Sequence, residues 1–315
     1  QTPPRPASAP DASTAAHRHP TTPRRGRWRA RRDARKGARV ARAAVSKPPT
    51  AIGQDARFVV EGLLGRGDWA HVYRARDRRT GVRVAVKVPR GRSVAHRSRL
   101  EREFSLLRRL DHPNLARPLE LYREGTEAFF TLELVEGQDL VSAVRAGSRR
   151  PGIDEGSEFT PCTAEGLARL GHALPQLVAA VAALHSAGLV HRDLNRDNVR
   201  LAFDGRVVVL DYGLVEPRAA GGANRGATAG VPAYMAPEQH ESRERGPASD
   251  WYSIGVLLFE ALTGGLPFTG DDRGVMVRKR TLDPPRPSAL VPGVPPLLDA
   301  LTWELLGRAP ERRPD

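Results

Sequence analysis

The stretch that decides the fold is HRDLNRDN at residues 191–198, followed by the apolar run VVVLDYG at residues 207–213. In the first stretch Asp193 can accept a proton from a hydroxyl group, and Asn198 offers a side-chain oxygen five residues later. In the second stretch Asp211 follows a β-branched strand and precedes a glycine. Carboxylate and amide oxygens suit a hard metal ion, so these stretches predict a metal site beside a candidate base.

Three further motifs stand upstream in a fixed order. The run GRGDWAHVY at 65–73 has two glycines after a strand, which let the backbone approach phosphates closely. Lys87 ends the strand VAVK, and Glu103 follows sixteen residues later on a predicted helix. Each motif alone has a plainer explanation: a glycine-rich hairpin turn, an edge-strand lysine in water, and a surface glutamate. Their order is what indicates a shared site.

Three more motifs follow downstream: APE at 236–238, DWYSIG at 250–255 and RRP at 312–314. The full series is too long to arise by chance, and from about Arg57 the chain resembles the protein kinase family. Its texture, as in YMAPEQ at 234–239, resembles that of bacterial serine/threonine kinases.

The resemblance implies an α+β, bilobal fold. Its small N-lobe, residues 55–136, is an antiparallel β-rich unit with one main helix, and its larger C-lobe, residues 137–315, is mainly helical. Residues 1–54 form a separate tail, and the family pattern expects a further helix after Asp315. Local patterns agree: they predict strands near 57–65, 70–75, 82–88, 115–121 and 128–134, and helices near 98–110, 167–187 and 250–262.

By resemblance, the reaction is transfer of the ATP γ-phosphate to a protein serine or threonine hydroxyl, with Mg²⁺. Asp193 would orient the acceptor hydroxyl, and Lys87, paired with Glu103, would hold the phosphates. Asn198 and Asp211 would hold the metal. Leu132 would lie at the back of the adenine pocket, Glu238 would pair with Arg313, and Asp250 would brace the catalytic loop. The expected ATP-binding residues are Leu64, Gly65, Arg66, Gly67, Val72, Ala85, Lys87, Glu133 and Val135.

Five positions depart from the family pattern. Ala70 replaces a glycine and Tyr212 replaces a phenylalanine, and both changes are mild. Asn195 stands where the family has a lysine that contacts the transferred phosphate, and Val231 replaces the threonine that links this lysine to the catalytic base. Arg200 stands where the family has an apolar floor under adenine. It could stack on the base, fill the pocket, or turn to solvent through a register shift.

These departures keep two hypotheses open: an active serine/threonine kinase, and a pseudokinase that acts as a binding or scaffold module. A third hypothesis makes the N-terminal tail a nucleic-acid tether. Tyrosine specificity fits less well, because the catalytic loop lacks the pattern of tyrosine kinases. Thr228 is the only serine or threonine between Asp211 and Glu238, so it is a candidate regulatory phosphosite that Arg192 would contact.

The net charge of +14 is uneven, because residues 1–50 hold 13 basic and 2 acidic residues and the remainder has a net charge of only +3. The tail is too polar to bury a core, so we expect it to be disordered. Its segment 24–42 could contact nucleic acid or an anionic surface weakly; the alternative is a solvated linker. The single cysteine favours a reducing, cytoplasmic setting. Apolar runs at 174–184 and 254–262 predict buried helices and no transmembrane segment.

Overall fold

The structure is a computed structural model, and it describes residues 49–314 apart from 68, 126, 149–158, 212–215, 218–229 and 241–245. Three predictions therefore concern residues outside the described part of the chain. They are the basic segment 24–42, the aromatic residue Tyr212 and the candidate phosphosite Thr228.

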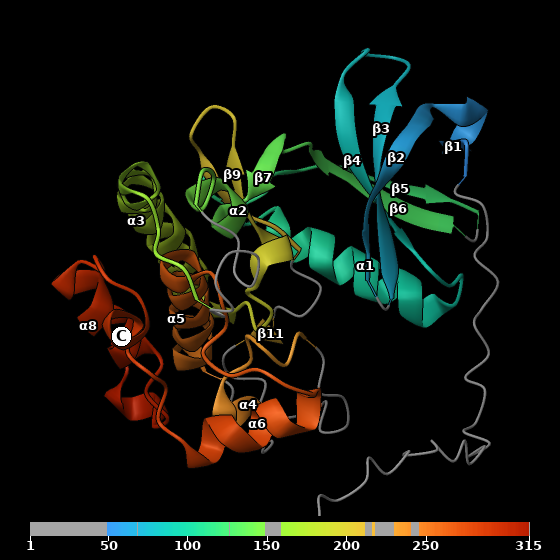
Figure 1. Cartoon of the computed structure of the whole chain (residues 1–315). Coiled ribbons are helices and arrows are strands. Elements are labelled where there is room, and N and C mark those ends of the chain that lie inside the picture. Colours follow the sequence, from blue (N-terminus) through green and yellow to red (C-terminus); the bar gives the residue numbers. More distant parts are fainter. Residues whose placement is uncertain are drawn as a thin grey trace, which may run out of the picture. The chain divides into compact units, whose positions relative to one another are not determined.

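A six-stranded antiparallel sheet forms the upper part of the kinase-like unit, in the order β1-β2-β3-β4-β6-β5 (Figure 1). Its strands are β1 (Ala51–Ile52), β2 (Phe58–Arg66), β3 (Ala70–Asp77), β4 (Arg83–Pro89), β5 (Pro118–Glu124) and β6 (Glu127–Glu133), and the 3₁₀ turn η1 is Gln54–Ala56. The five longer strands lie where the sequence predicted them, within three residues, because their β-branched and aromatic residues alternate between two faces.

The helix of the upper part is α1 (Val94–Leu107), which packs against β4, β5 and β6. The sequence predicted a helix from residue 98 to 110, so the observed helix begins four residues earlier and ends three residues earlier. Its start is set by Ser93, whose hydroxyl accepts a hydrogen bond from the backbone N–H of His96. The buried side chains Leu100, Phe104 and Leu107 have the predicted helical spacing.

The two faces of the sheet contribute to different cores. Phe129 and Phe130 are neighbours on β6 and point to opposite faces, as successive residues of a strand do. Phe129 packs with Phe58 in a small cluster on one face. Phe130 packs against Phe104 of α1, with 5.5 Å between ring centroids, in the large core that continues through the helical part.

The lower part is mainly helical, which confirms the predicted α+β, bilobal fold (Figure 1). Its helices are α2 (Leu140–Val144), α3 (Ala164–Ser186), α4 (Pro237–His240), α5 (Pro247–Thr263), α6 (Asp272–Thr281), α7 (Pro287–Leu290) and α8 (Pro296–Leu305), with the 3₁₀ turns η2 (Arg196–Asn198) and η3 (Pro310–Arg312). The proline-rich segment 283–296 contains α7, a helix that the local patterns did not predict.

Helix α5 is buried along almost its whole length, from residue 249 to 263. A helix that is apolar on all sides belongs in an interior, so the sequence predicted its place correctly. It ends at Gly264, whose φ of 81° is the left-handed conformation that glycine adopts without strain.

Helix α3 has 23 residues, and its length and composition would allow it to cross a membrane. The apolar run recognised in the sequence, residues 174–184, covers only part of this helix. One stripe of the helix, which includes Leu170, Leu177 and Leu184, is fully buried in the large core. Core helices of globular proteins pass the same length test, so the helix alone is weak evidence for a span.

Small strands connect the two parts. Strands β9 (Val199–Ala202) and β10 (Val207–Val209) form an antiparallel hairpin, and β7 (Gly137–Asp139) adds a third strand that the sequence did not predict. A Cβ atom on Gly137 would lie 2.2 Å from the carbonyl oxygen of Leu201, so only glycine permits this close pairing. Strands β8 (Leu189–Val190) and β11 (Glu216–Pro217) form a separate pair.

Candidate active site

A cavity of about 1030 Å³ lies between the sheet and the helical part. This volume is at the upper end of the ~300–1,000 Å³ that small-molecule sites occupy. The cavity is lined by all of the nucleotide-binding, catalytic and metal-binding residues that the sequence predicted. They are Leu64, Gly65, Arg66, Gly67, Val72, Ala85, Lys87, Glu103, Glu133, Val135, Asp193, Asn198 and Asp211.

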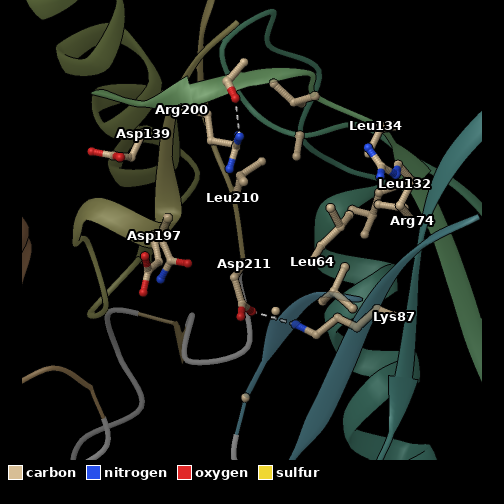
Figure 2. A pocket seen from close by; sticks show the side chains of 18 of the residues that line it. Leu64, Arg74, Lys87, Leu132, Leu134, Asp139, Asp197, Arg200, Leu210 and Asp211 are labelled. Carbon is tan, nitrogen blue, oxygen red and sulfur yellow. Dashed lines mark hydrogen bonds and ion pairs between the residues drawn. The ribbon is translucent and has the colours of Figure 1, made fainter. Parts of the chain in front are cut away.

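Lys87 lies on β4, which is an interior strand between β3 and β6, so the alternative of an exposed edge-strand lysine is wrong. Its side chain is 3 % exposed. Its Nζ is 2.7 Å from Oε1 of Glu103 and 2.6 Å from Oδ1 of Asp211 (Figure 2 shows the second contact). Burial lowers the pKa of a lysine, but these two carboxylates outweigh it and hold the pKa of Lys87 above its usual value.

Glu103 is also buried, so the alternative of a surface glutamate is wrong. It lies on the face of α1 that meets the sheet, and this places its carboxylate against Lys87. A buried carboxylate is costly unless a cation and hydrogen bonds compensate it. Lys87 provides this compensation, and the expected Lys87–Glu103 pair is confirmed.

Trp69, at the tip of the glycine-rich loop, was not singled out from the sequence. Its ring lies 4.9 Å from Nζ of Lys87 and 4.5 Å from the guanidinium carbon of Arg99 on α1. Both are cation–π distances. The loop tip is therefore packed over the lysine and the helix, and an aromatic residue between the loop glycines and β3 was the available signal.

The catalytic loop is held from below by Asp250, as expected. Its two carboxylate oxygens accept hydrogen bonds from the backbone N–H groups of His191 and Arg192, both at 2.8 Å. His185 provides a third contact, 2.9 Å from Nε2 to Oδ2. Arg192 has a φ of 70°, an uncommon value for a residue with a side chain. The two hydrogen bonds from Asp250 help to hold the loop in this conformation.

Asp193 is held by two amides. The side-chain nitrogen of Asn195 lies 3.0 Å from Oδ1, and that of Asn198 lies 3.2 Å from Oδ2. Burial raises the pKa of Asp193, and the nearby negative charge of Asp211 raises it further, while His191 and the two amides oppose the shift. The carboxylate is thus oriented for proton transfer and is a stronger base than an exposed aspartate.

The donor set fits a hard cation. Because the amide nitrogen of Asn198 donates to the backbone oxygen and to Oδ2 of Asp193, its carbonyl oxygen is left as an acceptor. Asp211 adds a carboxylate that is 39 % exposed and lines the same cavity. Oxygen ligands of this type suit Mg²⁺. In the part of the chain that the structure describes, no cluster of three His, Cys, Asp or Glu side chains could bind a metal.

Asn195 and Val231 line the cavity next to Asp193, so both departures lie at the acceptor end of the site. Asn195 is buried, and its side-chain oxygen accepts a hydrogen bond from the backbone N–H of Asp197 at 2.9 Å. Val231 is 40 % exposed and offers no hydroxyl. A neutral amide and an aliphatic side chain therefore lie at these two positions of the cavity.

Arg200 keeps the strand register, since it pairs with Val208 on β10 and Asp139 on β7. Its side chain lines the cavity, and its Nη2 donates to the carbonyl oxygen of Gly137 (Figure 2). The suggested register shift, which would turn this arginine to solvent, is therefore wrong. A cation stands where the family pattern has an apolar floor.

Two interactions outside the motif series were missed. Glu133, at the end of β6, is bound by the guanidinium of Arg206 at 2.9 Å, an ion pair between the sheet and the β9–β10 hairpin. Lys279 on α6 is buried, and its Nζ donates to the carbonyl oxygens of Pro232, Ala233 and Met235 at 2.6–2.9 Å. The burial of Lys279 had one signal in the sequence, because Lys279 lies four residues after the buried Val275 on the same helix.

The expected Glu238–Arg313 pair is confirmed. The guanidinium binds both carboxylate oxygens, at 2.6 and 2.9 Å, and both side chains are buried. The same guanidinium lies over the ring of Tyr252 on α5, 5.0 Å from its centroid. This two-point geometry ties the end of the described chain to α4 and α5.

Comparisons with known proteins agree with this geometry. The serine/threonine-protein kinases PknL and PknA of Mycobacterium tuberculosis are 34% and 32% identical to this chain, over 82% and 84% of its length. The DNA damage-responsive serine/threonine-protein kinase RqkA of Deinococcus radiodurans is 34% identical over 82% of the chain. The chain spans about three fifths of the length of PknL and PknA, and 37% of RqkA.

The family comparison covers most of the sequence. Residues 58–314 match the protein kinase domain, and this range includes strands β2 to β6, the cavity and the helical part described above. The order of the motifs, the bilobal fold and the buried lysine–carboxylate cluster are therefore features of one family. The chain belongs to the protein kinase family.

Proposed function

We propose that this chain is a serine/threonine protein kinase that transfers the γ-phosphate of ATP to a hydroxyl group of a protein. The observation that carries the proposal is the cluster of Lys87, Glu103 and Asp211 in the same cavity as Asp193 and Asn198. A lysine held at 2.7 and 2.6 Å from two carboxylates is a preorganised cation, and such groups stabilise the charge that develops on a phosphoryl group in transfer.

In this proposal each residue has a role that follows from its position in the cavity. Lys87 binds the phosphates and is kept in place by Glu103. Asp193 orients the acceptor hydroxyl and takes its proton, since both of its oxygens are fixed by amides. Asn198 and Asp211 hold Mg²⁺, which when bound neutralises phosphate charge. The apolar end of the cavity, formed in part by Val72, Ala85 and Leu132, takes the base.

The backbone of Val135 supports the placement of the base. In the described part of the chain, neither the N–H nor the carbonyl oxygen of Val135 has a hydrogen-bond partner, and the residue lines the cavity. An exposed donor and acceptor next to an apolar slot suit the edge of a heterocyclic base. We place this activity in the cytoplasm, where ATP is available and the single cysteine stays reduced.

The test is phosphotransfer from γ-labelled ATP with Mg²⁺ to the chain itself and to a generic protein substrate. We expect label on serine and threonine from the natural chain, and only background from Asp193→Ala. Arg273→Leu, an exposed change on α6, is the matched control and should retain full activity. If the natural chain gives no more label than Asp193→Ala under these conditions, the proposal is wrong.

We also propose that Thr228 is a regulatory phosphosite that Arg192 binds. The proposal rests on the sequence, because Thr228 is the only hydroxyl-bearing serine or threonine between Asp211 and Glu238. A phosphate at Thr228 would be two residues from Gly230, where an added Cβ atom would lie 3.2 Å from Oδ1 of Asp193. Mass spectrometry of active protein should find phosphate on Thr228, and an unmodified peptide from fully active protein would refute it.

A further inference from the structure

The most unusual group in the cavity is the guanidinium of Arg200. It projects from β9 into the cavity, which Val72, Ala85 and Leu132 also line. Figure 2 shows Arg200 and the Lys87–Asp211 pair at opposite ends of the pocket, with Leu210 between them. Arg66 and Arg74 also line the cavity, so Arg200 is one of four basic residues there, and it stands at the end away from the phosphate-binding lysine.

Arg200 is incompletely satisfied. Its Nη2 donates to the carbonyl oxygen of Gly137, and this hydrogen bond anchors the guanidinium next to β7. Its Nε is buried, and in the described residues this atom has no hydrogen-bond partner. In the same residues no carboxylate forms an ion pair with Arg200. The Nε atom is a buried donor without a partner, and such a group is costly, so the site is suited to a ligand that supplies an acceptor.

The chemistry of the group defines that ligand. A guanidinium is planar, carries only donors and stacks on aromatic faces. Contact with either purine face is favourable. At the edges, guanine presents two acceptors, O6 and N7, whereas adenine presents one acceptor beside an amino donor. An arginine whose N–H groups reach the edge of the base from this end of the cavity therefore favours guanine relative to adenine.

We propose that Arg200 makes the base end of this cavity accept guanine nucleotides alongside adenine nucleotides, so that the chain binds GTP as well as ATP. The proposal rests on the proposed function, because it assumes that Lys87 marks the phosphate end of a nucleotide site. It assigns Arg200 a direct contact with the base. Arg200 thereby becomes a specificity-determining residue of this chain.

The experiment is calorimetric titration of the full chain with the magnesium complexes of ATP and GTP. We expect both nucleotides to bind. We expect Arg200→Leu to weaken the binding of GTP by about tenfold relative to the binding of ATP, which is the discrimination that a good arginine–guanine contact provides. Arg200→Lys keeps the charge but loses the planar fork, so it should fall between the two. Arg273→Leu is the control and should leave both affinities unchanged.

Each other outcome overturns the inference. If Arg200→Leu strengthens the binding of both nucleotides, the arginine fills the pocket and does not distinguish the bases. An unchanged ratio would mean that it makes no contact with the base. Binding of ATP without GTP by the natural chain would refute the guanine proposal while leaving the kinase proposal intact. Failure of both nucleotides to bind would refute both proposals. Thermal melting of each variant shows whether it is folded.

Discussion

Two buried lysines, one in each part of the fold, show how surroundings decide what a buried cation does. Lys87 is 3 % exposed, contacts two carboxylates directly and lines the cavity. Lys279 is 1 % exposed and faces three backbone carbonyls, with the ring of Tyr252 5.2 Å away. The first borders space that a ligand can enter, whereas the second completes the hydrogen bonding of a packed loop.

The difference also appears in their acid–base properties. The carboxylates raise the pKa of Lys87 despite its burial. Burial lowers the pKa of Lys279 to about 7, and Glu238 opposes this only in part. A cation with nearby counter-ions is kept charged for work on phosphates, while one with carbonyl acceptors keeps its proton only below about neutral pH.

The largest expected effect separates the two lysines by function. Lys87→Met should lower phosphotransfer by roughly 10²–10³-fold, because it removes a preorganised cation at the transferring phosphate. Lys279→Met should lower it less than tenfold. Initial rates at saturating ATP, measured well below the melting temperature of each variant, make the comparison. Equal losses of phosphotransfer activity in the two variants would contradict the proposed difference between the two lysines.

The second effect concerns stability. Lys279→Met leaves the carbonyl oxygens of Pro232, Ala233 and Met235 without their donor. We expect the free energy of unfolding to fall by about 1–3 kcal/mol, the usual cost of unsatisfied buried polar groups. Urea denaturation followed by fluorescence measures it, with the exposed Arg273→Leu as the reference. A stability unchanged from that reference would show that the three hydrogen bonds contribute little.

The third effect is the pH dependence of stability. Between about pH 7 and 10 the unfolded chain binds one proton more than the folded chain at Lys279, because its pKa is lowered in the folded state. The free energy of unfolding should therefore rise with pH in this window, by up to about 1.4 kcal/mol per unit. Lys87 has the opposite sign, since its raised pKa means that stability is lost only at higher pH. Denaturation at pH 7, 8 and 9 should show a rise that Lys279→Met abolishes.

A third lysine, introduced at the acceptor end, sharpens the comparison. The double change Asn195→Lys and Val231→Thr places a cation beside Asp193 in the same cavity, with a hydroxyl that can hold it. Because a preorganised cation stabilises charge on the phosphate, as proposed for Lys87, this cation should raise kcat by about tenfold. Steady-state kinetics of the double variant and of each single variant test this. A lower kcat with unchanged KM would show that the natural loop is adapted to Asn195.

The smallest expected effect is a shift in the pH profile. Asp193 must be ionised to accept a proton, and burial raises its pKa, so activity should decline at a higher pH than that of an exposed aspartate. Asn195→Ala removes a hydrogen bond to the ionised form. The acid limb of kcat should then move to higher pH, by about half a unit. Rates from pH 4.5 to 8 would reveal the shift, and a move to lower pH would contradict the assigned contact.

Much of the fold followed from local pattern. The strands from β2 to β6 were predicted because alternation and turn residues specify them within short windows. The start of α1 was missed because Ser93 gives a cap signal only once the following residues are known to be helical. Strand β7 was missed because three residues with glycine and aspartate have little strand propensity, and only pairing with β9 makes them a strand.

The site residues were predicted by the order of motifs, and the geometry then decided between alternatives. Lys87 and Glu103 each had a surface explanation that a sequence pattern could not exclude. Their burial depends on β4 being an interior strand and on the face that α1 presents to it. The Arg206–Glu133 ion pair joins residues 73 positions apart, and nothing in either local sequence points to the other.

The sequence by itself determined the family, the two-part fold and the set of residues that meet in the cavity, because these depend on motif order and on local hydrophobic pattern. Only the tertiary structure decided that Arg200 lines the cavity and that Lys279 is buried under the loop before α4. It also decided that Asp211 lies beside Lys87, 124 residues away in sequence. The physical reason is that burial and pairing depend on which distant segments share a surface, and identical residue types can face water or the core.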